Sequence, residues 1–454
     1  MNKSNLIIIG AGPGGYRAAI HAAQHGLTVT IIESAEVGGT CLNRGCIPTK
    51  TLCRNAEILD TLHHADTFAL EGSGYSLNFA KVMERKQQVV EQLRGGIETL
   101  MKAPGISLVR GFASFKDAKT ISVDDEEYSA DNIIIATGSD SKCPPIEGTQ
   151  LDGVINSTQL LDIDHVPSRL CIIGAGVIGM EFASVFSSFG SKVTVVEFLK
   201  ECLPILDSDI AKRLRQTIGK RGVEFSMQSA VKSISESTGE SGERQLTVSF
   251  ERKGKPQQVD ADVVLIATGR KPNVEGLGLE NAGVEYSPKG IATDDHFQTN
   301  VPGIYAIGDV NARCMLAHAA TFQGLHVVNK IVGLTDNIRF DIMPSAIFTN
   351  PEAASVGASE DQLEASGKAY ECRKGFYRSN GKALAMNEID GMIKLLLDTE
   401  DNLRILGCHA FGAHSSDIIQ EVAALMNAGA NVRSLSDIVH VHPTLSEILH
   451  DIVC

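Results

Sequence analysis

The sequence lacks long apolar runs, an excess of basic residues and a regular cysteine framework. No stretch approaches the roughly 20 apolar residues that a membrane-spanning helix needs, so we expect no membrane insertion. The 454 residues include 41 Lys and Arg against 55 Asp and Glu, and the net charge of -14 repels polyphosphate backbones and anionic membrane surfaces. We therefore expect no nucleic-acid partner.

Targeting and disulfide signals are also missing. Met1 to Asn5 leads directly into an apolar run, without the charged n-region of a signal peptide. Ten cysteines are scattered from Cys41 to Cys454 without the density of a secreted disulfide scaffold, so most should be reduced, buried thiols. We expect a cytoplasmic protein, or the mature form of an organellar one.

What is present is the composition of a folded globular chain. Hydrophobic residues make up 43 % and charged residues 21 %, which excludes a disordered or fibrous protein. At roughly 100 to 200 residues per domain, the length predicts two to four domains.

An internal repeat organises the chain. Residues 7–33 and 171–197 match at a constant offset. Each copy has an apolar run, the pattern G-x-G-x-x-G, a helix-period segment, a second apolar run and a terminal acid, which together predict a βαβ unit. The glycines are Gly10, Gly12 and Gly15 in the first copy and Gly174, Gly176 and Gly179 in the second.

The glycine spacing has a physical reason in a dinucleotide site. The first glycine permits the tight turn, the second lets backbone approach a pyrophosphate, and the third lets the helix pack on the strand. The helix N-terminus then receives the phosphates. Glu33 and Glu197 end the second strands, where a carboxylate can accept hydrogen bonds from ribose hydroxyls. One such motif is weak evidence, but two in register predict two dinucleotides.

Three further apolar runs end on small-residue turns, at 133–139, 264–270 and 304–309. We expect the first two to end the sheets of the two nucleotide domains. The third finishes on Asp309, for which a capping role is favoured and a contact to a ribose or polyol hydroxyl stays open.

From about Asp341 the pattern changes to strand-like runs at 392–397 and 403–407 and a helical stretch at 416–429. These predict an α+β module with another purpose, such as subunit contact. The polar stretches 124–127 and 233–255 are predicted as solvated hairpins.

A cysteine pair follows the first βαβ unit, in the sequence GGTCLNRGCIPTK from Gly38. Half of a metal site is disfavoured, because zinc takes four ligands and no second Cys/His cluster of suitable spacing is evident. Unpaired structural thiols are the second alternative. If a flavin occupies the first nucleotide site, a disulfide packed against its ring could exchange electrons with it, and the pair would then be a redox dithiol, which we favour. A helix beginning near Cys46 and the cation of Lys50 would stabilise a thiolate there.

The segment HVHPTLSE from His440 offers an imidazole and a carboxylate in one turn. His442 could take a proton from a dithiol and return it at neutral pH, and Glu447 could orient the ring. Thr444 and Glu447 also form a capping-box pattern, and the sequence alone does not decide between the two roles. We interpret His440 as structural, whereas Pro443 favours a positioned His442.

These motifs resemble the pyridine nucleotide-disulfide oxidoreductases over nearly the whole length. The resemblance rests on GAGPGGYRAAIHAAQHG from Gly10, GGTCLNRGCIPTK from Gly38, ATGS from Ala136, GAGVIGMEF from Gly174, ATGRKPN from Ala267, YAIGD from Tyr305, MLAHAA from Met315 and HVHPTLSE from His440. It implies an α/β fold with two Rossmann-like dinucleotide-binding domains, for FAD and NAD, and a C-terminal α+β dimerisation domain. The implied boundaries are 1–145 and 273–340 for the FAD domain, 146–272 for the NAD domain and 341–454 for the dimerisation domain.

The resemblance also implies site residues. Cys41 would exchange with substrate sulfur and Cys46 would contact the flavin, with Lys50 near the flavin and paired with Glu181. His442 and Glu447 would act as acid and base from the other subunit of a homodimer. The implied FAD contacts are Gly10, Gly12, Gly15, Glu33, Thr40, Lys50, Ala113, Thr137, Gly138, Ser139, Asp309, Met315, Leu316, Ala317 and His318, and the implied NAD contacts are Gly174, Gly176, Gly179, Glu181, Glu197, Val231 and Gly269.

The implied reaction oxidises protein-bound dihydrolipoamide to lipoamide through a Cys41–Cys46 disulfide and FAD, and reduces NAD to NADH. The lipoyl group would arrive on an E2 component or H-protein of a 2-oxo acid dehydrogenase or glycine cleavage complex. No arginine lies near Glu197, which favours NAD over NADP.

Three other functions compete. A reductase of mercuric ion or glutathione is disfavoured, because a second terminal cysteine and a 2′-phosphate arginine are missing. A flavin transhydrogenase or diaphorase would leave the cysteine pair and His442 unexplained, and a non-catalytic subunit would leave every motif unexplained. The chain also departs from the family pattern at Gln323 and Asp417, where glutamate is commoner, and in its single terminal Cys454.

Overall fold

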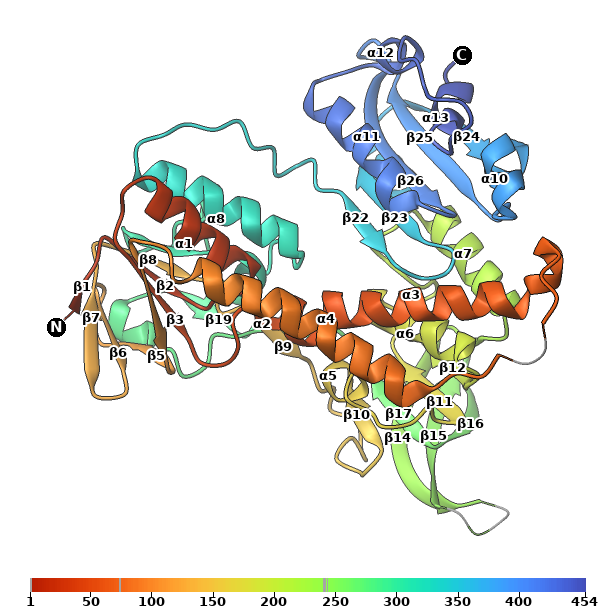
Figure 1. Cartoon of the computed structure of the whole chain (residues 1–454), viewed down its shortest axis with the longest axis horizontal. Coiled ribbons are helices and arrows are strands. Elements are labelled where there is room, and N and C mark those ends of the chain that lie inside the picture. Colours follow the sequence, from red (N-terminus) through yellow and green to blue (C-terminus); the bar gives the residue numbers. More distant parts are fainter. Residues whose placement is uncertain (1, 73–74, 240–241, 243) are drawn as a thin grey trace. The chain divides into compact units, whose positions relative to one another are not determined.

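The computed structural model describes residues 2–72, 75–239, 242 and 244–454, which form two compact units (Figure 1). The first unit contains Met1–Thr51, Lys81–Lys142 and Gly269–Ile338, and the second contains Leu52–Ala80, Cys143–Thr268 and Arg339–Cys454. The finer domain boundaries given above stay a prediction.

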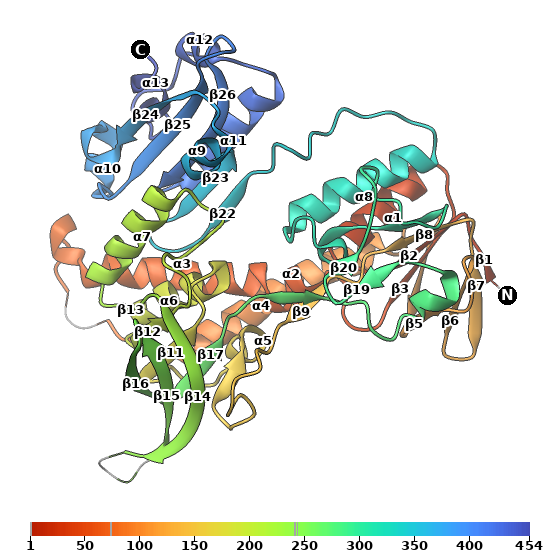
Figure 2. The ribbon, with the colours of Figure 1, turned by 180° about the vertical axis from the view of Figure 1, so that it is seen from behind.

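The first unit is built on a five-stranded parallel sheet. Its strands are short apolar runs, and apart from the edge strand at 106–110 they are largely buried on both faces, as expected for a parallel sheet covered by helices. In strand order they are β21 (Ile304–Ala306), β8 (Asn132–Ile135), β2 (Leu6–Ile9), β3 (Val29–Glu33) and β4 (Ile106–Arg110). Helices α1 (Pro13–Gln24) and α8 (Ala317–Ile331) lie side by side in both views (Figures 1 and 2).

Smaller elements complete this unit. A second sheet has the order β1 (Asn2–Lys3), β7 (Glu126–Ser129), β6 (Thr120–Val123) and β5 (Ala113–Phe115), and its apolar face shares a core with the parallel sheet. The other elements are α2 (Gly39–Arg44), the first part of α3 (Cys46–His63), most of α4 (Phe79–Leu100), the antiparallel pairs β9 (Ser139–Ser141) with β18 (Arg270–Pro272) and β19 (Tyr286–Ser287) with β20 (Gly290–Ile291), and 3-10 turns at Leu279–Ala282 and Gly308–Asn311.

The second unit begins with a parallel sheet of the same kind. Its strand order is β10 (Val154–Asn156), β17 (Val263–Ile266), β11 (Arg169–Ile173), β12 (Lys192–Val196) and β13 (Glu224–Ser226). Its helices are α5 (Ser157–Leu160), α6 (Val177–Ser188) and α7 (Ser208–Lys220). An antiparallel sheet of β14 (Ser229–Thr238), β15 (Arg244–Arg252) and β16 (Lys255–Ala261) packs against it.

The C-terminal part of this unit is a five-stranded antiparallel sheet with helices. The strand order is β22 (Ser345–Ile347), β23 (Ala353–Gly357), β26 (Arg404–Phe411), β25 (Met392–Asp398) and β24 (Tyr370–Phe376). Helix α11 (Ser415–Asn427) covers β23 and β26, and the other helices are α9 (Glu360–Ser366), α10 (Gly381–Met386), α12 (Val432–Ser436) and α13 (Glu447–Asp451). The predicted α+β module is confirmed.

Both predicted βαβ units are present, as β2-α1-β3 and β11-α6-β12. The expectation that the runs at 133–139 and 264–270 end the sheets is wrong, because neither run forms an edge strand. Strand β21 pairs with the outer side of β8, and β10 pairs with the outer side of β17. The hairpin at 124–127 is confirmed by β6 and β7. The stretch 233–255 forms part of the β14-β15-β16 sheet, with residues 240, 241 and 243 outside the described part. Among the helices in the described residues, none is long and apolar enough to cross a membrane.

Candidate functional site

The first βαβ turn shows why each of its three glycines is present. Gly10 has a φ of +101°, and a Cβ there would lie 2.4 Å from the Ala136 carbonyl oxygen. A Cβ on Gly15 would lie 1.9 Å from the Gly10 carbonyl oxygen. A Cβ on Gly12, by contrast, would meet only the Cα of Gly39, at 4.0 Å. The fold itself therefore requires the first and third glycines, while the second leaves space in front of helix α1.

The second βαβ turn repeats this arrangement. A Cβ on Gly174 would lie 2.5 Å from the Ala267 carbonyl oxygen and one on Gly179 only 2.0 Å from the Gly174 carbonyl oxygen, whereas one on Gly176 would meet nothing within 4 Å. Helices α1 and α6 both have the middle glycine as their N-cap residue, and no side chain caps either helix there. The N–H groups of both first turns are thus available to an anion such as a pyrophosphate.

The acids at the ends of β3 and β12 brace these turns. Glu33 accepts hydrogen bonds from the backbone N–H of Ala11 at 2.6 Å and of Ala35 at 2.8 Å, and Glu197 accepts the N–H of Ala175 at 2.5 Å. Both side chains are buried. Sequence reasoning assigned them only to ribose hydroxyls and missed this role, which the position of an acid beside a glycine turn could have indicated.

Asp309 does not cap a helix, so that interpretation is wrong. It lies within a 3-10 turn, and its carboxylate accepts a hydrogen bond from the Ser139 hydroxyl at 2.5 Å. The Arg270 guanidinium donates to the same hydroxyl at 2.7 Å and lies 3.8 Å from the carboxylate. Ser139 and Asp309 were both predicted at the FAD site, and the structure brings them together. Arg270, in the ATGR turn, was missed.

The 3-10 turn that carries Asp309 is held by Gln323, one of the departures from the family pattern. Its side-chain oxygen accepts hydrogen bonds from the Gly308 N–H at 2.8 Å and from the Asn311 amide at 3.0 Å, and it is 2 % exposed. A neutral amide therefore supplies both acceptor contacts at this position.

The two cysteines lie at the junction of two consecutive helices. Cys41 is in α2, Cys46 is the first residue of α3, and Gly45 lies between them. Both are present as thiols. The hydrogen bond between the Cys41 thiol and the Cys46 sulfur raises the pKa of Cys41, burial raises it further, and the positive charge of Lys50 opposes this.

His442 and Glu447 meet as the sequence suggested. The Nδ1 atom of His442 lies 2.9 Å from Oε1 of Glu447, and Oε2 of Glu447 accepts the Thr444 N–H at 2.7 Å. The bond from Thr444 lowers the pKa of Glu447, and the bond from His442 lowers it further. The His442 ring is 81 % exposed, and the bond to Pro443 is cis.

The predicted capping box is only half formed. Helix α13 begins at Glu447, with Ser446 as its N-cap residue. The Thr444 hydroxyl is buried and, among the described residues, has no hydrogen-bond partner. Glu447 therefore uses one oxygen on the backbone and the other on His442, so the two roles left open by the sequence coexist.

The remaining predicted residues are spread over both units. Thr137 donates a hydrogen bond to the Asn273 carbonyl oxygen at 2.7 Å, and Glu181 accepts the Phe348 N–H at 2.9 Å. In the first unit Thr40 lies in α2, Ala113 begins β5, Met315 and Leu316 precede α8, and Ala317 and His318 are its first two residues. In the second unit Val231 lies in β14. The dithiol belongs to the first unit and the His442–Glu447 pair to the second. The predicted meeting of the dithiol with the His442–Glu447 pair of the other subunit stays a prediction.

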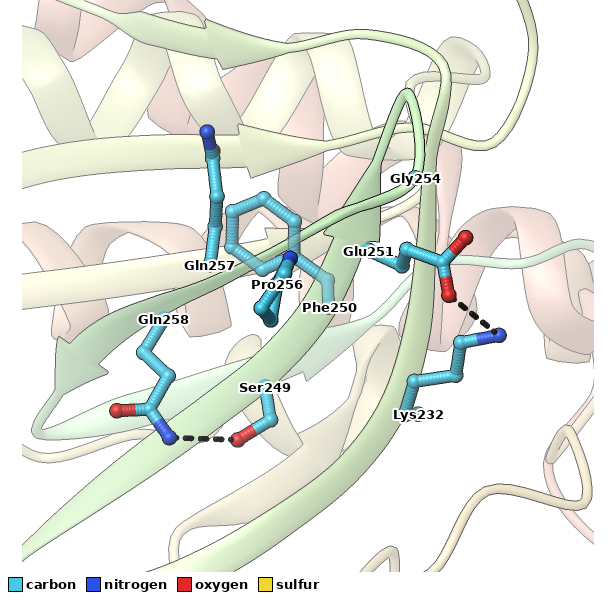
Figure 3. Close-up of a pocket in the computed structure, with 8 residues that line it drawn as sticks. All are labelled: Lys232, Ser249, Phe250, Glu251, Gly254, Pro256, Gln257 and Gln258. Carbon is cyan, nitrogen blue, oxygen red and sulfur yellow. Dashed lines mark hydrogen bonds and ion pairs between the residues drawn. The ribbon is translucent and has the colours of Figure 1, made fainter.

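A hollow of about 580 Å³ on the β14-β15-β16 sheet contains none of the predicted residues (Figure 3). Four of its polar side chains pair with one another, Lys232 with Glu251 at 3.6 Å and Gln258 with Ser249 at 3.2 Å. No group of three or more His, Cys, Asp or Glu suited to a metal ion occurs within the described ranges.

Two family models together match almost the whole chain. The model described as pyridine nucleotide-disulphide oxidoreductase matches residues 4–324, and the model of the dimerisation domain of the same family matches residues 343–453. The chain belongs to the pyridine nucleotide-disulphide oxidoreductase family. It is an FAD- and NAD-dependent flavoprotein disulfide oxidoreductase whose C-terminal module is a dimerisation domain.

Individual relatives are similar over their full length. The chain is 38 % identical to a dihydrolipoyl dehydrogenase of Bacillus subtilis, covering 98 % of this chain and 95 % of the relative, and 38 % identical to one of Chlamydia muridarum, covering 99 % and 96 %. Among solved structures, the Cu(II) complex of the HOCl-induced flavoprotein disulfide reductase RclA from Escherichia coli matches with a TM-score of 0.88 and 31 % identity, covering 100 % of this chain and 99 % of that one.

The residues present fit two dinucleotide cofactors. In each unit the middle glycine leaves open the space in front of an uncapped helix N-terminus, and a Cβ at that glycine would project into this space. A buried acid beside each turn offers oxygen lone pairs for hydroxyl groups.

Proposed function

We propose that this protein is a dihydrolipoyl dehydrogenase, which oxidises protein-bound dihydrolipoamide and reduces NAD to NADH. One observation carries the proposal: the dithiol at the α2-α3 junction and the bonded His442–Glu447 pair occur together in a chain 38 % identical over its length to enzymes of that name. A thiol-disulfide exchange needs both a disulfide and a base.

The chain's own groups have distinct tasks in this proposal. A thiolate of the substrate attacks Cys41 in the oxidised Cys41–Cys46 disulfide, and Cys46 leaves as a thiolate. The second substrate thiol then releases lipoamide and leaves Cys41 reduced. His442 accepts the substrate proton, and Glu447 holds the ring through Nδ1 so that Nε2 is the basic atom.

The cofactor sites belong to the same proposal. Gly10, Gly12, Gly15, Glu33, Ser139 and Asp309 would hold FAD, and Gly174, Gly176, Gly179 and Glu197 would hold NAD. Bound FAD supplies the electron transfer between the dithiol and NAD. Lys50 opposes the rise in the pKa of Cys41, and a positive charge there favours thiolate in the pair.

The partners follow from the substrate. We propose a homodimer in which the dimerisation domain presents His442 and Glu447 to the dithiol of the partner subunit. The lipoyl group would be carried by an E2 component or an H-protein. We place the reaction in the cytoplasm, where a redox dithiol is kept reducible.

The test is anaerobic mixing of the purified holoenzyme with dihydrolipoamide, followed by NAD. We expect long-wavelength absorbance from a Cys46 thiolate next to the flavin, and then NADH formation. Cys46→Ser should lose the long-wavelength band, while Cys143→Ser, which removes an exposed thiol elsewhere, should keep it. His442→Gln should lower the turnover on the order of 10²- to 10⁴-fold, the contribution of a general base.

One result would overturn the proposal. If dihydrolipoamide leaves the flavin oxidised while NADH reduces it, the disulfide faces a different substrate. The RclA structure was solved as a Cu(II) complex, so Cu(II), mercuric ion and glutathione disulfide would then be the acceptors to assay with NADH.

A further inference from the structure

A second histidine–glutamate pair lies in the same segment as His442. His440 is two residues before it, and its side chain is 6 % exposed, against 81 % for His442. Its Nε2 atom lies 2.8 Å from Oε1 of Glu421 in helix α11, and its Nδ1 atom lies 3.1 Å from the carbonyl oxygen of Ile438. Each ring nitrogen of His440 thus faces an oxygen atom.

These contacts suit a ring that donates from both nitrogens. A backbone carbonyl oxygen and a carboxylate oxygen can only accept hydrogen bonds, whereas a neutral imidazole donates from one nitrogen alone. A neutral His440 would direct a nitrogen lone pair at an oxygen lone pair in a buried site, which is unfavourable. The doubly protonated ring satisfies both contacts at once.

We infer that His440 is held as a positively charged imidazolium by Glu421 and the Ile438 carbonyl, and that this charge makes it a positioning residue for the His442–Glu447 pair. The inference rests on the proposed function, in which His442 is the base.

The charge has a route to the reacting group. The positive charge of His440 is one of the influences that lower the pKa of Glu447, after the bonds from Thr444 and His442. A carboxylate kept ionised accepts the Nδ1–H of His442 and leaves Nε2 as the basic atom. The other titratable groups around His440 are Glu421 on α11, His442 in its own segment and His450 on α13, whose ring centre lies 5.6 Å away.

The first test reads the protonation state directly. In the ¹⁵N-histidine-labelled holoenzyme at pH 8, an imidazolium gives two similar ring ¹⁵N shifts and a neutral ring gives two widely separated ones. We expect one imidazolium signal that disappears in His440→Gln and becomes a neutral pattern in Glu421→Gln. Glu421→Gln changes a carboxylate to an amide of the same shape, so it also serves if His440→Gln fails to fold.

The second test reads the effect on His442. In His440→Gln the cation is lost and the Glu421 carboxylate remains, so protonated His442 is favoured. The acid limb of kcat/KM for dihydrolipoamide should move to higher pH by roughly half to one unit, the size expected for one nearby charge. His64→Gln, which replaces an exposed histidine bonded to the Asp60 carbonyl, should leave the limb in place.

The outcomes separate the inference about His440 from the proposed function. A neutral His440 pattern in the wild-type protein at pH 8, or an acid limb that does not move in His440→Gln, would overturn the inference. Failure of the wild-type enzyme to oxidise dihydrolipoamide would instead overturn the proposed function, and the NMR signature would still decide the charge of His440.

Discussion

At the scale of single residues, the same amino acid has different reasons to be present. In each glycine turn the third glycine is needed because a Cβ would overlap a backbone carbonyl, as at Gly15 and Gly179. The middle glycine, at Gly12 and Gly176, meets no such obstacle. The space beside the middle glycine is therefore open to a ligand. Stability and binding can therefore be separated by substitution at neighbouring positions.

The pair Gly176→Ala and Gly179→Ala tests this separation. Gly179→Ala should lower the stability of the folded protein by about 1–3 kcal/mol or more, because the obstacle, 2.0 Å away, is backbone that cannot move aside cheaply. Gly176→Ala should keep the wild-type unfolding midpoint and raise the KM for NAD at least about tenfold. Thermal unfolding and NAD titration measure the two effects. A Gly176→Ala protein with normal NAD affinity would show that the turn does not receive a pyrophosphate.

At the scale of elements, helix α8 and the turn Gly308–Asn311 are joined through one side chain. Gln323 on the helix accepts from two donors of the turn that also carries Asp309. The Asp309 carboxylate accepts a hydrogen bond from Ser139, which follows β8 in the chain. One hydrogen-bonded path therefore connects α8, the turn Gly308–Asn311 and the segment after β8 around the predicted FAD site.

Replacing Gln323 tests how far this path supports the cofactor. Gln323→Leu removes an acceptor from two buried donors, and each unsatisfied donor costs about 1–3 kcal/mol. We expect a lower unfolding midpoint and faster loss of FAD on dilution, measured by flavin fluorescence. Gln323→Glu keeps an oxygen acceptor and should lose less of both. Equal behaviour of the leucine and glutamate variants would mean that the turn keeps its shape without this contact.

At the scale of the whole molecule, the parts that could be predicted were those coded by local pattern. The two βαβ units follow from residues within about 27 positions, because glycine turns and continuous apolar runs depend on near neighbours. The strands that complete each sheet could not be ordered in this way, since β21 joins β8 from far along the chain. The pairing of Arg270 with Ser139 and Asp309 was missed for the same reason. His442 and Glu447 were found because they lie only five positions apart in the sequence.

A contact that no local pattern indicated connects the second nucleotide-binding sheet to the dimerisation module. Asp207 at the start of α7 is fully buried, and its carboxylate lies 2.7 Å from Nζ of Lys394 on β25. Its backbone N–H donates to Nδ1 of His409, at 3.3 Å, on the neighbouring strand β26. The other ring nitrogen of His409 bonds the Ala358 carbonyl oxygen at 3.1 Å, so this ring is neutral, with Nε2 as the donor.

This neutral histidine predicts a pH dependence of stability. Burial lowers the pKa of His409 and Lys394 lowers it too, while Asp207, the bond to Ala358 and Asp361 oppose the shift. The folded state therefore binds the proton less readily than the unfolded chain, whose histidines titrate near 6.5. The stabilisation is complete above that pH and is lost as the pH falls below it toward the lowered pKa. Protonated Nδ1 would also face the Asp207 N–H, so acid should loosen the contact between α7 and β26.

Urea unfolding between pH 8 and pH 5 measures this effect. The loss of stability should be smaller in His409→Gln than in the wild type, since glutamine can keep an acceptor and a donor without titrating. Identical pH slopes for the two proteins would mean that His409 does not report on this contact.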